Sequence, residues 1–111
     1  MNANIKELHE TLLGQHVALS EKLGNETNAD NARAILVEME EILHRISIAQ
    51  GLLFRQNSAA LSKSIEKIRE ADTELTNAIA SAGKAADYVK AAGDFLKFVD
   101  KTLDLAKTLA V

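Results

Sequence analysis

The sequence predicts an all-α fold, an elongated antiparallel bundle of three long helices with coiled-coil-like packing. Apolar residues recur at steps of three and four along almost the whole chain, which is the pattern of amphipathic helices. No alternating run rich in Val, Thr or Tyr predicts a strand. The clear interruptions are a polar loop at residues 24–28 and a glycine-containing turn at residues 81–84. We therefore expect one helical domain, residues 1–111.

The first helix is expected over residues 4–23. Asn4 and Glu7 have the spacing of a capping box, in which two side chains satisfy free backbone N–H groups at a helix start. Gly24 follows the last turn and predicts the C-terminus, because glycine tolerates the left-handed conformation that ends many helices. The expected apolar stripe comprises Ile5, Leu8, Leu12, Leu19 and Leu23, with His16 filling its gap.

The second helix is expected over residues 28–82, capped by Asn28 or by Thr27 with Asp30. Apolar residues at three-four spacing form a coiled-coil-like seam in its first half. This seam comprises Ala32, Ile35, Met39, Ile42, Ile46, Ala49 and Leu53. The pattern then resumes one helical step late, at Leu61, Ile65, Ile68, Leu75 and Ile79, which places a stutter near Asn57.

The stutter at Asn57 leaves two architectures open. A break capped by Asn57 or Ser58 would give four helices of similar length, which suit a compact bundle. However, Gln56, Asn57 and Ser58 include neither glycine nor proline, so we expect one continuous helix that bends at the stutter. Gly83 ends it in either case, and a last helix is expected over residues 85–110.

Two of these helices carry more apolar surface than one stripe. Leu52, Leu53 and Phe54 cover the circumference of the central helix, so this segment is expected to be buried all round. Since three helices of one chain leave such surface uncovered, we expect a homodimer or higher oligomer with two-fold symmetry. A fourth helix in a monomer would cover the same surface. The predicted interface residues are Val37, Ile48, Leu52, Phe54, Phe98, Leu105 and Leu109.

Composition excludes several classes of function. The chain has no cysteine, a net charge of -3 and only 4% aromatic residues, which argues against disulfide, thiol or zinc-knuckle chemistry and against nucleic-acid binding. No basic leader and no apolar stretch near 18 residues is present, so a cytoplasmic protein without a membrane span is expected. We expect no cofactor and a non-enzymatic interaction protein: an adaptor, a chaperone-like protein or a partner-binding module.

The alternative function is a metal-dependent all-α enzyme with a carboxylate and histidine site at a dimer interface. Glu41 and His44 have the Glu-x-x-His spacing of di-metal bundles. Glu38 and Glu41 match the first half of the Glu-x-x-Glu and Glu-x-x-Asp pair in all-α nucleotide pyrophosphohydrolases, whose carboxylates bind magnesium. No second half is present, and Glu41 and His44 are expected to face solvent or another subunit.

Overall fold

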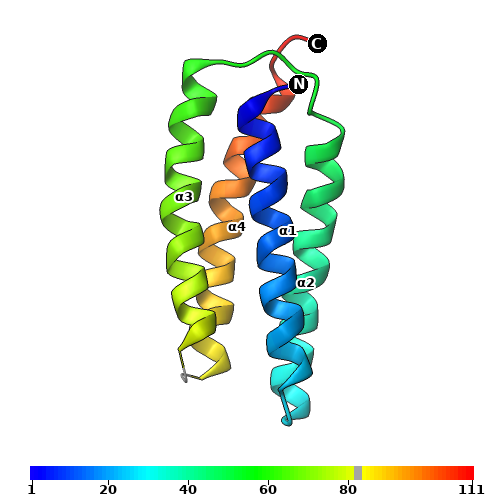
Figure 1. Ribbon diagram of the computed structural model, residues 1–111, viewed down its shortest axis with the longest axis vertical. Coiled ribbons are helices and arrows are strands. Elements are labelled where there is room, and N and C mark those ends of the chain that lie inside the picture. The colour runs from blue at the N-terminus through cyan, green and yellow to red at the C-terminus, as the bar shows by residue number, and fades with distance from the viewer. Residues whose placement is uncertain (82–83) are drawn as a thin grey trace.

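The computed structural model describes residues 1–81 and 84–111, which contain four α-helices and no strand (Figure 1). The helices are α1 (Ala3–Gly24), α2 (Ala29–Gln50), α3 (Ala59–Ala80) and α4 (Ala85–Lys107). The Cα atoms extend over 46 × 22 × 16 Å. The predicted all-α class and the elongated shape are therefore confirmed.

The helices alternate in direction and pack as two hairpins. α1 packs against α2 and α3, and α4 packs against the same two helices, so α2 and α3 lie on a diagonal of the bundle. The connection between α2 and α3 consequently crosses one end of the molecule (Figure 1). Both chain termini lie at that end, which we call the connection end.

The expected continuous helix over residues 28–82 is wrong, because the chain reverses at residues 51–58. The break falls at the predicted stutter, and Ser58 is the N-cap of α3: its extended backbone lets the hydroxyl accept from the N–H of Leu61 at 3.1 Å. Leu52, at the start of the break, and Leu61, after it, are both buried. The reversal thus turns the two halves of the seam toward one core. The predicted end at Ala82 and Gly83 lies outside the described residues.

Both ends of the chain hold the connection in place. The backbone N–H of Asn2 donates to the carbonyl of Leu53 at 2.7 Å, and that of Gln56 donates to the carbonyl of Ala110 at 2.6 Å. The Arg55 guanidinium adds a 2.7 Å bond to the carbonyl of Leu109. These bonds satisfy backbone groups that the break between α2 and α3 would otherwise leave free.

The caps of α1 differ from the prediction. Asn2, not Asn4, is the N-cap: its Oδ1 accepts from the N–H groups of Asn4 and Ile5 at 3.0 and 3.2 Å. Glu7 does not complete a capping box, because it pairs with Arg69 of α3. At the other end, Gly24 is the last helical residue, and none of the described glycines has a positive φ. For α2 the prediction of Asn28 as cap is confirmed by its 3.0 Å bond from the N–H of Asn31.

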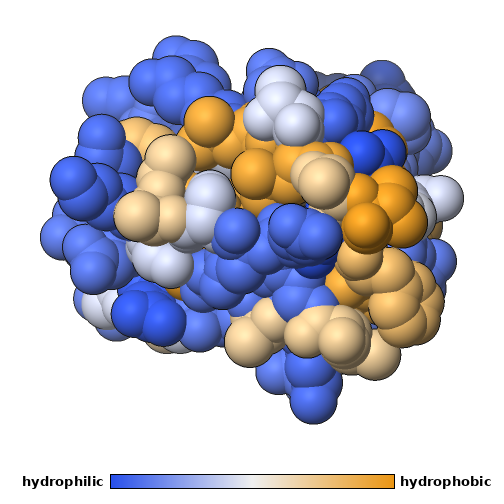
Figure 2. Space-filling view, turned by 90° about the horizontal axis from the view of Figure 1, so that it is seen from above, coloured by the Kyte–Doolittle hydropathy of each residue, from blue (hydrophilic) through white to orange (hydrophobic). Residues whose placement is uncertain are grey.

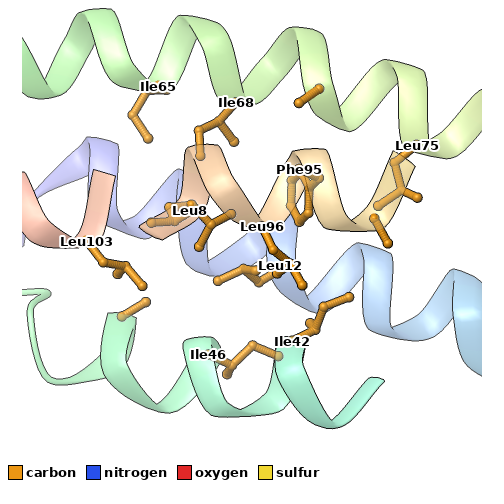
Figure 3. Close-up of a cluster of buried hydrophobic side chains, with 14 of the residues drawn as sticks. Leu8, Leu12, Ile42, Ile46, Ile65, Ile68, Leu75, Phe95, Leu96 and Leu103 are labelled. Atoms are coloured by element: carbon orange, nitrogen blue, oxygen red, sulfur yellow. The ribbon is translucent and has the colours of Figure 1, made fainter. Parts of the chain in front are cut away.

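The core lies along the bundle axis and is contributed by all four helices. Figure 3 shows leucine and isoleucine side chains from opposite helices meeting there, with Phe95 of α4 among them. In α1 the gap in the apolar stripe is filled by Gln15, which is 3% exposed, and not by His16, which is half-buried. Gln15 remains hydrogen-bonded because its amide donates to Asp72 Oδ1 at 2.6 Å and to Thr76 Oγ1 at 2.9 Å.

Candidate interaction surfaces

The candidate metal ligands do not form a site within the chain. Glu41 pairs with Arg45 at 2.8 Å, and the same guanidinium binds Asp100 of α4 at 2.7 Å. His44 is exposed and Glu38 is half-buried. Among the described residues, no three His, Cys, Asp or Glu side chains are close enough to hold an ion together. The metal-enzyme alternative therefore requires ligands from a second copy.

The charged side chains on this side of α2 form an ion-pair network with α4. Burial raises the pKa of Glu38, and the neighbouring Glu41 raises it further, whereas Arg45 lowers it. The hydrogen bond with Asp100 is the main cause of the raised pKa of Arg45. The guanidinium thus ties α2 to α4 at the position where the alternative function would need open ligands.

The predicted interface residues fall into two groups. Ile48, Leu52, Phe98 and Leu109 pack against the core of their own chain. Val37, Phe54 and Leu105 are exposed. The expectation that residues 52–54 are buried all round is therefore wrong for Phe54, which is 73% exposed, whereas Leu52 is 5% exposed. The break after α2 is the cause, because it turns Phe54 away from the bundle axis and supplies a fourth helix.

A groove follows the outer face between α3 and α4. Its apolar lining consists of Ala60 and Ala71 on α3, and of Phe98 and Leu105 on α4. Two of the predicted interface residues thus lie in it. The small alanine side chains leave the ring of the half-buried Phe98 accessible, with the Lys101 ammonium 5.8 Å from the ring centroid.

Charged side chains line this groove in two clusters. The basic cluster lies toward the connection end and comprises Lys63, Lys67 and Lys101. The acidic cluster lies toward the end of the bundle opposite the connection end and comprises Glu70, Glu74 and Asp94, with Lys97 beside it. Within the described part of the chain, the ion pairs at or below 4.0 Å involve none of these seven side chains. Asp100 also lines the groove and is paired with Arg45, whereas these seven charges of both signs are separated and unpaired.

A hydrogen bond between the half-buried hydroxyl of Ser64, which lines the groove, and the buried hydroxyl of Thr102 fixes the register of α3 against α4. Thr102 is fully buried, and its hydroxyl donates to the carbonyl of Phe98 at 2.9 Å. Since that hydroxyl has one proton, the Ser64 hydroxyl is the donor in the contact between the two side chains. Ser64 and Thr102 consequently lie at the same level of the bundle.

A second surface, which the sequence analysis missed, lies on the opposite side of the bundle over α1 and α2. We call it the aliphatic strip; its exposed members are Leu13, Val17, Leu36 and Leu43. At about 100° per residue, the α1 members lie on the flank away from Gln15, which faces α3. The α2 members lie on the flank away from Arg45, which faces α4. The spacings of four and seven residues could have revealed this second stripe.

A third apolar surface covers the connection end. Met1, Phe54 and Val111 are exposed there, and Leu53 and Leu109 are half-buried. Figure 2, seen from above this end, shows apolar residues gathered on it and crossed by a band of hydrophilic ones. The hydrogen bonds that join the connection to both chain ends lie at the same end of the bundle.

Comparisons of the chain with protein-family models, with curated proteins and with solved structures give no match. No helix among the described residues has the length and apolarity that a bilayer span requires.

Proposed function

We propose that this protein is a non-enzymatic helical interaction protein that associates with itself, as a homo-oligomeric adaptor, chaperone-like protein or partner-binding module. One observation supports this proposal above the others. The core is complete within a single chain, with all four helices contributing, and yet large apolar side chains remain exposed on three surfaces. Contiguous exposed apolar surface on a small protein is typical of sites that bind other proteins.

The aliphatic strip shows how much binding free energy such a surface provides. Its four side chains are each 43–56% exposed, so each gains about 1 kcal/mol when the remaining half is buried. One strip therefore contributes about 4 kcal/mol, whereas association of two proteins costs about 4–15 kcal/mol in lost freedom. A partner must consequently bring a comparable apolar surface or complementary charge, and a second copy of this chain brings both.

Light scattering after size-exclusion chromatography tests the proposal. At tens of micromolar protein we expect a mass at least twice the 12.0 kDa of one chain. A single species of one-chain mass across that concentration range would contradict self-association. A hydrodynamic radius alone is insufficient, because the elongated bundle elutes early even as a monomer.

Thermal unfolding with divalent cations separates this function from the metal-dependent alternative. We expect Mg²⁺, Mn²⁺ and Zn²⁺ to leave the midpoint unchanged, because Glu41 is paired with Arg45 and the described residues offer no cluster of three ligands. A rise in midpoint that disappears in Glu41→Ala would instead support a metal site between copies.

A further inference from the structure

The charges that line the groove on α3 are arranged with inverted symmetry. Lys63 and Lys67 precede a midpoint between residues 68 and 69, and Glu70 and Glu74 follow it. Lys67 and Glu70 are equally far from this midpoint, and so are Lys63 and Glu74. Each lysine is therefore matched by a glutamate at the same distance on the other side.

Two of the charged side chains that line the groove on α4 repeat this symmetry about the same level of the bundle. Asp94 and Lys101 are equally far from a midpoint between residues 97 and 98. Ser64 and Thr102 lie at one level, and each is the same number of residues from the midpoint of its own helix. The two midpoints consequently lie at the same level along the bundle axis, which is the level of Phe98.

We propose that a second copy of this chain docks on the α3–α4 groove, related by a two-fold axis that crosses the groove at this level. The proposal rests on the self-association proposed above and identifies the face and the symmetry. The axis lies in the interface perpendicular to the helices, so that α3 faces α3 of the partner in antiparallel orientation and α4 faces α4 of the partner.

This symmetry pairs every member of the basic cluster with an opposite charge. Lys67 lies against Glu70 of the partner subunit. Lys63 lies against Glu74 of the partner subunit, and Lys101 lies against Asp94 of the partner subunit. The two-fold axis repeats each contact, which gives six pairs. A parallel arrangement would bring the two basic clusters together, so the charges favour the antiparallel one.

The centre of the same face contains Phe98 and Ala71, with Lys97 beside them. Phe98 lies beside the axis and meets its own copy, and the small side chain of Ala71 on α3 allows a close approach. With Asp100, which also lines the groove, its four lysines and four carboxylates sum to zero, so no net repulsion opposes docking although each chain carries -3. The aliphatic strip stays uncovered on the opposite side.

Two triple variants test the proposed symmetry. Lys63→Glu, Lys67→Glu and Lys101→Glu make the groove acidic except at Lys97. Glu70→Lys, Glu74→Lys and Asp94→Lys make it basic. We expect each variant alone to lose self-association by at least about a hundredfold in Kd, because every pair becomes a like-charge contact. We expect an equimolar mixture to form a heterodimer, measured by sedimentation velocity with one variant fluorescently labelled.

A matched control separates this inference from a general effect of charge. Lys6→Glu, Arg33→Glu and Lys84→Glu change the net charge by the same amount as the acidic groove variant does, on exposed positions outside the groove, and this control should associate like the unmodified chain. Circular dichroism verifies that every variant is folded. Failure of the two groove variants to associate on mixing, or undiminished association of either alone, would overturn the proposed interface while leaving self-association intact. An unmodified chain that is monomeric would remove both proposals.

Discussion

The break between α2 and α3 predicts that neighbouring residues Leu52 and Phe54 contribute very differently to stability. Leu52 is 5% exposed and belongs to the core, whereas Phe54 is 73% exposed on the connection end. In a continuous central helix buried all round, both side chains would be part of an interface. Alanine substitutions at the two positions therefore distinguish the two architectures.

The expected magnitudes follow from burial. Leu52→Ala removes a buried isobutyl group and leaves a cavity, which costs about 2–5 kcal/mol. A domain of this size has a total free energy of unfolding of about 5–15 kcal/mol, so the loss is a large fraction of it. Phe54→Ala removes a mostly solvated ring and should change the free energy of unfolding by no more than about 0.5 kcal/mol.

Urea unfolding followed by circular dichroism measures both effects, at low micromolar protein to limit any contribution from association. Equal losses at the two positions would refute the chain reversal at residues 51–58. The same burial means that Leu52→Glu tests the fold and not assembly: it would place an unpaired carboxylate in the core of the monomer and unfold it.

Other predictions concern single groups in the bundle. Tyr88 has a buried hydroxyl without a hydrogen-bond partner among the described residues. Tyr88→Phe should therefore stabilise the protein by about 1 kcal/mol in urea unfolding, and a loss of stability would show that the hydroxyl is bonded. The hydrogen bond from Arg69 lowers the pKa of Glu7, so the pair stabilises the fold above about pH 4.5 and this contribution disappears as the pH falls through the lowered pKa. Since both partners are partly exposed, Glu7→Gln should cost at most about 1 kcal/mol at pH 7 and nothing at pH 2; a cost independent of pH would contradict the pairing. Leu36→Ser with Leu43→Ser in the aliphatic strip should leave the oligomeric mass unchanged; dissociation would place the interface on the strip.

The sequence predicted the helical class and most of the core because three-four periodicity reports which side of a helix is buried. Ile35, Ile42, Leu61 and Leu75 are all buried as that pattern requires. The phase shift near Asn57 was also visible. The sequence alone could not show whether this phase shift marks a stutter in one long helix or a reversal between two helices, because both produce the same shift. Only packing against the other helices distinguishes them.

Long-range hydrogen bonds explain the other differences between the predicted and the observed structure. Asn2 replaced Asn4 as the cap of α1 because Asn4 bonds instead to Asn57 and Ser62, more than 50 residues away. Gln15 could be buried because its partner Asp72 lies on α3. Local spacing contains no information on such contacts. A single chain does not test the predicted interface residues, which all remain predictions: Val37, Ile48, Leu52, Phe54, Phe98, Leu105 and Leu109.

Sedimentation equilibrium of the unmodified chain at several salt concentrations tests the central claim, self-association, most directly. We expect a dimer of twice 12.0 kDa at tens of micromolar protein and low salt, with an association constant that falls as salt screens the charges of the groove. A mass of 12.0 kDa at every protein and salt concentration would contradict the account. A dimer whose association constant does not change with salt would support self-association but place the interface outside the charged groove.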